Sequence, residues 1–180
     1  PVFAGVFLST NNGTSWTALD AGLTKSHVSA LAVSPTGNLF AGTDIGVFLS
    51  TNNGTSWKAV NTGLPIYPYV EALAVSHDWA GGTNLLVGTS GRGVFLSTND
   101  GTSWTAASAG LTDTYVYALA ISHDWAGRTN LFAGTSRSGV FLSINNGTSW
   151  TKANTGLTDA NVSALAISPD GATGTNIFAG

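Results

Sequence analysis

The residues of this 180-residue chain that could do chemistry lie where otherwise similar repeats differ from one another. All four tyrosines, two arginines and the only glutamate fall in or beside short connections: Tyr67, Tyr69, Glu71, Arg92, Tyr115, Tyr117 and Arg137. A tyrosine ring offers a flat apolar face and a polar tip, which suits contact with sugar rings or peptides. The pattern predicts one ligand-binding surface, and the alternative is drift among loops that tolerate change.

Catalysis has weaker support in the sequence. Glycosidases usually need two carboxylates on either side of the scissile bond, and most of the nine acidic residues lie in turn-like segments, where aspartate is ordinary. Two of the three histidines, His77 and His123, belong to a repeated Ser-His-Asp-Trp-Ala-Gly segment, which indicates a scaffold role. The sequence therefore predicts no catalytic residue.

Composition excludes several classes of partner and cofactor. A net charge of −3 with six Lys and Arg leaves no basic patch for nucleic acid. The absence of cysteine removes disulfides, thiolate zinc sites and cysteine nucleophiles, and no apolar run approaches the roughly 20 residues of a membrane span. Asn99-Asp100-Gly101 resembles part of a calcium loop, but the dense carboxylates and the distal glutamate are missing. We expect neither metal nor cofactor.

The elements that must position these residues are set by a repeated eight-residue phrase, Ser-Thr-Asn-Asn-Gly-Thr-Ser-Trp in its first copy. Its four tryptophans lie 41, 47 and 46 residues apart, a period typical of repeat architectures. The shared positions are Ser9, Asn11, Gly13 and Trp16; Ser50, Asn52, Gly54 and Trp57; Ser97, Asn99, Gly101 and Trp104; and Ser143, Asn145, Gly147 and Trp150. Asn, Ser and Gly favour a self-contained turn, and the tryptophan buries a large ring against it.

Each repeat reads as four short strands separated by turns, as at 70–76, 84–89, 94–97 and a fourth strand that opens at Trp104. Four strands per roughly 45 residues predict an all-β fold, a β-propeller of four-stranded antiparallel blades. The expected repeats are 1–27, 28–69, 70–115 and 116–161, with 162–180 starting or completing a further blade.

The two ends of the pattern overlap, because 2–18 reads as the last three strands of a blade while 162–168 and 176–180 read as the first two. Phe3-Ala4-Gly5 and Phe178-Ala179-Gly180 are the same strand twice. We therefore expect a section of a longer propeller or, with a second chain, half of an eight-bladed ring, in preference to a closed four-bladed ring. A homodimer or a longer chain is the expected context.

The repeated phrase resembles the Asp-box, or BNR, repeat Ser-x-Asp-x-Gly-x-Thr-Trp. This chain has asparagine where the family usually has aspartate, and Ser15, Ser56, Ser103 and Ser149 where threonine is common. The resemblance implies a propeller whose boxes join the third and fourth strands and are structural. The family includes sialidases, xyloglucan-cleaving glycosidases and sortilin-like receptors, so the fold does not decide the function. The sialidase Arg-Ile-Pro signature is absent, and Arg128 is expected on the opposite face from Arg92 and Arg137.

The functional expectation is a secreted or cell-surface, bacterial, non-catalytic scaffold that binds glycan or protein. The alternative is part of a sialidase-like or xyloglucanase-like glycoside hydrolase whose catalytic residues are incomplete in this chain. Trp79 and Trp125, in loops at the other end of the blades, are secondary candidates for stacking on sugars, although packing against a neighbouring box is the simpler interpretation.

Overall fold

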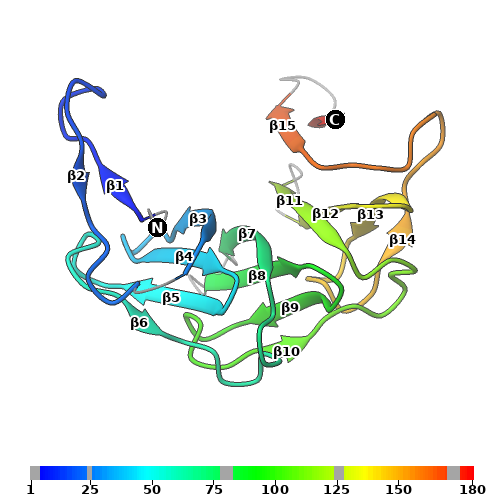
Figure 1. Ribbon diagram of the computed structural model, residues 1–180. Helices are drawn as coiled ribbons and strands as arrows, with labels where there is room; N and C mark the ends of the chain where they lie inside the picture. The colour runs from blue at the N-terminus through cyan, green and yellow to red at the C-terminus, as the bar shows by residue number, and fades with distance from the viewer. Residues whose placement is uncertain (1–4, 24–25, 78–82, 124–127, 170–174) are drawn as a thin grey trace.

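The computed structural model describes residues 5–23, 26–77, 83–123, 128–169 and 175–180, and throughout these ranges the only regular elements are β-strands. Three complete four-stranded antiparallel sheets lie along the chain (Figure 1). The first contains β3 (Val28–Val33), β4 (Leu39–Thr43), β5 (Gly46–Ser50) and β6 (Lys58–Ala59). The second contains β7 (Val70–His77), β8 (Thr83–Thr89), β9 (Gly93–Ser97) and β10 (Thr105–Ala106). The third contains β11 (Val116–His123), β12 (Thr129–Thr135), β13 (Gly139–Ser143) and β14 (Thr151–Lys152).

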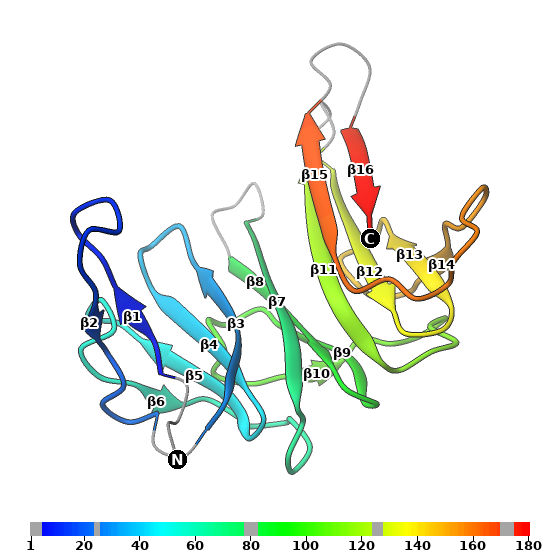
Figure 2. The same ribbon diagram turned by 45° about the horizontal axis from the view of Figure 1, so that its top comes forward.

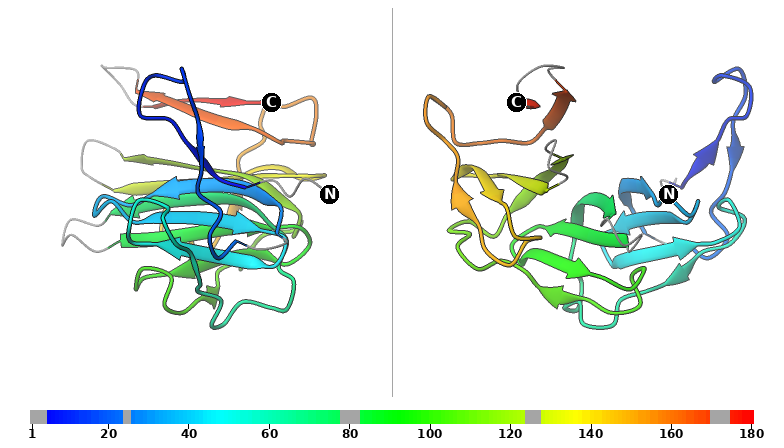
Figure 3. Two further views of the ribbon diagram at one scale, coloured as in Figure 1. Left: turned by 60° about the vertical axis from the view of Figure 1, so that its left-hand side comes forward. Right: turned by 180° about the vertical axis from the view of Figure 1, so that it is seen from behind.

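Two hairpins flank these sheets. The N-terminal hairpin is β1 (Phe7–Leu8) with β2 (Thr17–Ala18), and the C-terminal hairpin is β15 (Leu165–Pro169) with β16 (Thr175–Ala179). The sheets follow one another around an open arc, and the hairpins lie at its opposite ends (Figures 1 and 3). The sequence expectation of four-stranded antiparallel blades is confirmed. The stretch 2–4, expected to belong to a further N-terminal strand, lies outside the described residues.

The first strand of each sheet lies on the inner side of the arc. These strands, β3, β7, β11 and β15, run side by side in the same direction (Figure 2). Their apolar residues alternate with small ones, which suits a strand packed between neighbouring sheets. The fourth strands, β6, β10 and β14, lie on the outer side (Figure 1).

A buried threonine closes the hairpin between the second and third strands of every complete sheet. The hydroxyls of Thr43, Thr89 and Thr135 donate to the carbonyls of Gly46, Gly93 and Gly139 at 2.7–2.9 Å. Each of these threonines is fully buried, so the hydroxyl needs this partner. The same bond therefore closes this hairpin in all three complete sheets.

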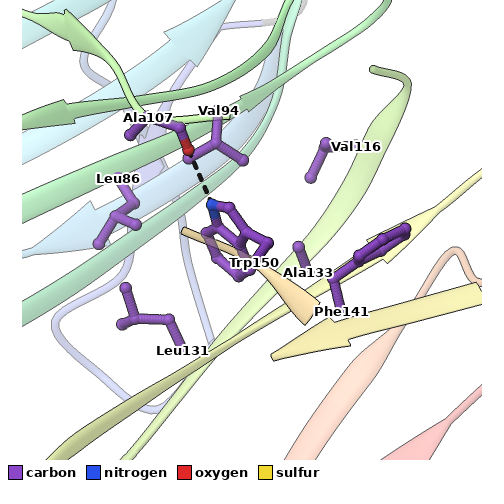
Figure 4. Packing of buried hydrophobic residues seen from close by; sticks show 8 residues of the cluster. All are labelled: Leu86, Val94, Ala107, Val116, Leu131, Ala133, Phe141 and Trp150. Atoms are coloured by element: carbon purple, nitrogen blue, oxygen red, sulfur yellow. Dashed lines mark hydrogen bonds between the residues drawn. The ribbon is translucent and has the colours of Figure 1, made fainter. Parts of the chain in front are cut away.

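The hydrophobic core lies between adjacent sheets rather than within one. Between the second and third sheets the Trp150 ring is 3% exposed, and its indole N–H donates to the carbonyl oxygen of Ala107 at 2.7 Å (Figure 4). The side chains of the same cluster are Leu86, Val94, Ala107, Val116, Leu131, Ala133 and Phe141. An equivalent cluster around Trp104 joins the first and second sheets. In these two junctions the tryptophan of the box therefore fastens its sheet to the preceding one.

Candidate functional site

The candidate residues lie at one end of the sheets, where the connections between sheets meet the hairpin turns between second and third strands. We call this set the tyrosine rim: Tyr67, Tyr69, Glu71, Arg92, Tyr115, Tyr117 and Arg137. Tyr67, Tyr69 and Tyr115 are 60%, 52% and 43% exposed, Arg92 and Arg137 are exposed, and Glu71 and Tyr117 are half-buried.

Backbone hydrogen bonds join connections and turns into a continuous lattice across the rim. The Tyr69 N–H donates to the Asp44 carbonyl at 3.3 Å, and the Ser90 N–H donates to the Tyr69 carbonyl at 2.9 Å. Ser90 also forms an antiparallel bridge with Tyr115, whose carbonyl accepts from the Ser136 N–H at 3.1 Å. Tyr69 and Tyr115 therefore flank Ser90, which places their backbones about 10 Å apart, two strand spacings.

Contacts with the neighbouring turns hold the Tyr115 ring in place. A Cβ added to Gly91 would lie 3.2 Å from Tyr115 Cζ and 3.4 Å from its hydroxyl oxygen, so the ring lies against this glycine. The Asp113 carboxylate accepts from the Tyr115 N–H at 3.0 Å and from the Arg137 N–H at 2.7 Å. Asp113 thus ties Tyr115 to the turn that carries Arg137.

The backbone at two rim tyrosines is unusual. Tyr67 and Tyr69 have φ angles of 50° and 46°, on either side of Pro68. Every other non-glycine residue with positive φ in the described ranges is an asparagine or aspartate of a box turn: Asn12, Asn53, Asp100 and Asn146. Asparagine and aspartate tolerate this region, whereas it is costly for a bulky side chain.

Glu71 and Tyr117 lie at β-bulges in the first strands. The register shifts between Val70 and Ala72 and again between Val116 and Ala118. The equivalent bulge residue of the first sheet is Ser29, whose hydroxyl donates to the carbonyl of Val70 in the next first strand. A bulge re-aims a side chain, so the substitution of glutamate or tyrosine for serine puts a larger group at the inner strand of the second and third sheets.

The chemistry that the rim offers is contact and hydrogen bonding. Within the described residues, the side chains of Glu71, Arg92 and Arg137 make no hydrogen bond or ion pair, and the four tyrosine hydroxyls have no partner. The described ranges contain no group of three or more His, Cys, Asp or Glu side chains arranged to hold a metal ion. They also contain no helix long and apolar enough to cross a membrane.

The box residues form turns of identical pattern. In the third copy the Ser97 hydroxyl donates to Asn99 Oδ1 at 2.9 Å, the Gly101 N–H donates to Ser97 Oγ at 2.9 Å, and the Ser103 N–H donates to Asn99 Oδ1 at 2.9 Å. The other three copies make the same bonds. These residues lie between third and fourth strands and support the fold, whereas Trp79 and Trp125 lie outside the described residues.

The candidate set from the sequence leaves out three residues that support the rim, namely Asp44, Ser90 and Asp113. A signal for Asp113 exists, because its carboxylate accepts from the N–H two residues later, and Asp159 does the same for Asn161 at 2.9 Å. Aspartate forms such turns readily. No comparable pattern marks Ser90, whose role depends on pairing with a connection 25 residues away in sequence.

Comparison with solved structures supports this architecture, whereas comparisons of the sequence find no match. No protein-family model matches the sequence, and no curated protein matches it either. An ancestral GH74 enzyme matches 81% of this chain with 29% identity and a TM-score of 0.64. The GH74 xyloglucanase of Xanthomonas campestris matches 89% with 22% identity and a TM-score of 0.64, and the GH74 enzyme of Niastella koreensis matches 81% with 26% identity and a TM-score of 0.56.

The fold is that of a β-propeller. The chain spans only 21%, 29% and 22% of the length of these three enzymes, so the likeness covers a section of each.

Proposed function

We propose that this chain is a non-catalytic, extracellular propeller that binds an oligosaccharide across the tyrosine rim. The observation that carries the proposal is the positive φ of Tyr67 and Tyr69. An L-residue in this region costs about 1–2 kcal/mol, and both side chains are more than half exposed, so burial does not offset the cost. Strain of this kind clusters at ligand-binding sites, where the surrounding structure over-determines it.

An oligosaccharide fits the chemistry of the rim. Sugar rings present apolar faces edged by hydroxyls, and the rim presents tyrosine rings with hydrogen-bonding groups nearby. Tyr69 and Tyr115 are held on one lattice about 10 Å apart, so separate rings of one ligand chain can contact both. The similarity to GH74 enzymes at up to 29% identity supports a carbohydrate ligand.

Hydrolysis is the second candidate function, and the same likeness favours it. It requires a pair of carboxylates across the bond to be broken. Glu71 is the only carboxylate of the rim, and both oxygens of the nearby Asp113 accept backbone N–H groups. Asp113 is therefore committed to holding the loops, which supports binding over turnover in this chain.

The experiment is calorimetric titration with xyloglucan oligosaccharides and with cellohexaose. We expect saturable binding to at least one of them and a loss of about tenfold, equal to 1.4 kcal/mol, in Tyr69→Ala and in Tyr115→Ala. The matched controls are His27→Ala and Asn161→Ala. These residues occupy the position in their repeats that Tyr69 and Tyr115 occupy in theirs, directly before Val28 and Val162. Affinity in the controls should stay within about twofold of the unaltered chain.

Two results would contradict the proposal. Absence of saturable binding to both oligosaccharides, or an equal loss in the controls, would remove the rim as a glycan site. Release of shorter products from the same oligosaccharides, abolished by Glu71→Gln, would establish the hydrolase instead.

A further inference from the structure

The contacts of the box tryptophans show how adjacent sheets pack within the chain. The indole N–H groups of Trp57, Trp104 and Trp150 donate to the carbonyls of Leu19, Val60 and Ala107 in the preceding repeat at 2.7–2.8 Å. These three tryptophans are 3–6% exposed. Trp16 occupies the same place in the first box but is 63% exposed, and its indole N–H has no partner among the described residues.

The other half of the junction is a glycine. A Cβ added to Gly22, Gly63 or Gly110 would lie 2.1–2.3 Å from the carbonyl oxygen of the tryptophan that docks there, so each junction requires a residue without a side chain. Gly156 is the fourth glycine of this series, with a φ of 89° against 89–100° in the others, and nothing lies within 4 Å of its Cβ position. Trp16 and Gly156 are thus the two unmatched halves of one junction.

The apolar residues beside these two positions show the same contrast. Phe7 is 56% exposed, whereas its equivalents Phe48, Phe95 and Phe141 are at most 8% exposed. Phe178 is 59% exposed, whereas Phe40 in the same place is fully buried. An apolar cavity of about 420 Å³ opens beneath the N-terminal hairpin, lined by Phe7, Leu8, Leu31 and Val33 among others.

Among the described residues, the two hairpins are complementary parts of one sheet. The C-terminal hairpin has the first two strands of a repeat and the N-terminal hairpin has the last two. In the first sheet Phe40 pairs with Leu49, so the same register would pair Phe178 with Leu8. Because the hairpins lie at opposite ends of the open arc, they do not meet within one chain (Figures 1 and 3).

We propose that a second copy of this chain covers these surfaces. The N-terminal hairpin of one copy adds to the C-terminal hairpin of the other to complete a four-stranded blade, and its Trp16 docks on Gly156 with the indole N–H donating to the carbonyl of Ala153. The same contact made twice closes a two-fold ring. Six complete and two composite blades give eight, within the usual range for propellers.

The first test is the mass of the 180-residue chain in solution by light scattering. We expect twice the chain mass of 18.3 kDa. Trp16→Ala should shift the protein to one chain, because it deletes the docking ring, and Gly156→Val should do the same by placing a side chain where the tryptophan carbonyl must lie. Ile66→Ser is the matched control, since Ile66 is 83% exposed and lies away from the junction, and it should leave the mass unchanged.

The second test identifies the occupant and the register. The chain has no cysteine, so the double variant Leu8→Cys/Phe178→Cys should form disulfides only where these positions meet. Both side chains are exposed, so folding should survive their replacement. Oxidation should give a covalent two-chain species, and the shifted pair Phe7→Cys/Phe178→Cys should give far less, because a one-residue slip turns one thiol to the other face.

Other outcomes overturn the proposal. A disulfide within one chain would mean that the arc closes on itself, and a ladder of larger species would mean an open chain of copies. One-chain mass with no disulfide would mean that neither hairpin is covered by a copy, and the occupant would then be further repeats of a longer polypeptide. Oligosaccharide binding at the rim is measured separately, so this test is independent of the proposed function.

Discussion

Replacement of Trp104 by phenylalanine measures what a single tryptophan contributes to a junction between blades. Trp104 is 3% exposed, and its indole N–H donates to the Val60 carbonyl at 2.7 Å. Phenylalanine retains most of the apolar contact but leaves that carbonyl without its donor, which costs about 1–3 kcal/mol. The smaller ring adds a cavity term, so we expect a loss of about 2–4 kcal/mol in the free energy of unfolding.

The assay is urea denaturation followed by far-ultraviolet circular dichroism in the Gly156→Val background, which we expect to contain one chain, as light scattering will verify. In that species Trp16→Phe is the control, because its ring is 63% exposed and its N–H has no described partner. It should change stability by less than about 0.5 kcal/mol. A loss below about 0.5 kcal/mol in Trp104→Phe, or equal losses at the two positions, would refute the view that indole docking stabilises the junctions.

Three further predictions test glycine packing, the box turn and the strained rim by the same denaturation assay. Gly63→Ala should cost more than about 3 kcal/mol or prevent folding, because its Cβ would lie 2.1 Å from the Trp104 carbonyl oxygen. Gly37→Ala, where φ is 84° but no atom lies within 4 Å, should cost about 1 kcal/mol. Similar costs for the two substitutions would contradict the packing argument. Asn99→Ala should cost about 2 kcal/mol because Asn99 Oδ1 accepts from Ser97 and Ser103, whereas Asn99→Asp, which retains this acceptor, should cost less than about 1 kcal/mol. Tyr67→Asn should leave stability unchanged or raise it by up to about 1 kcal/mol, because asparagine tolerates a φ of 50°. The same substitution should lower the affinity for oligosaccharide. Clear destabilisation would show that the tyrosine ring supports the fold.

The sequence predicts the blades well because the information is local. Glycine at the hairpin turn, alternating apolar residues in the first strand and the box phrase recur in every repeat, and each fixes structure within a few residues. The strand limits shift only slightly, since the fourth strand of the second sheet begins at Thr105 rather than at Trp104. Trp104 lies outside this strand, and its indole N–H donates to the Val60 carbonyl of the preceding repeat.

The rim is predictable in place but not in conformation. The chain alternates between the two ends of each antiparallel blade, so the connections between blades and the turns between second and third strands share one end. The positive φ of Tyr69 depends on hydrogen bonds to Asp44 and Ser90, which belong to turns of two different sheets. No pattern within the connection encodes those partners, because they are chosen by how neighbouring blades pack. Whether the rim binds a glycan stays a prediction until it is measured.

Because the repeats are nearly identical, each position can be compared with its equivalents in the other repeats. This comparison supports the inference that another blade covers the terminal hairpins. A repeat array that ends in water normally has terminal units with a polar outer face, and exposed strand edges are usually blunted by charge or proline. The terminal hairpins of this arc instead present Phe7, Trp16 and Phe178, the same residue types that are buried inside it. An edge built like an interior contact is suited to meeting another blade, and the mass and cross-linking experiments decide whether a second copy supplies it.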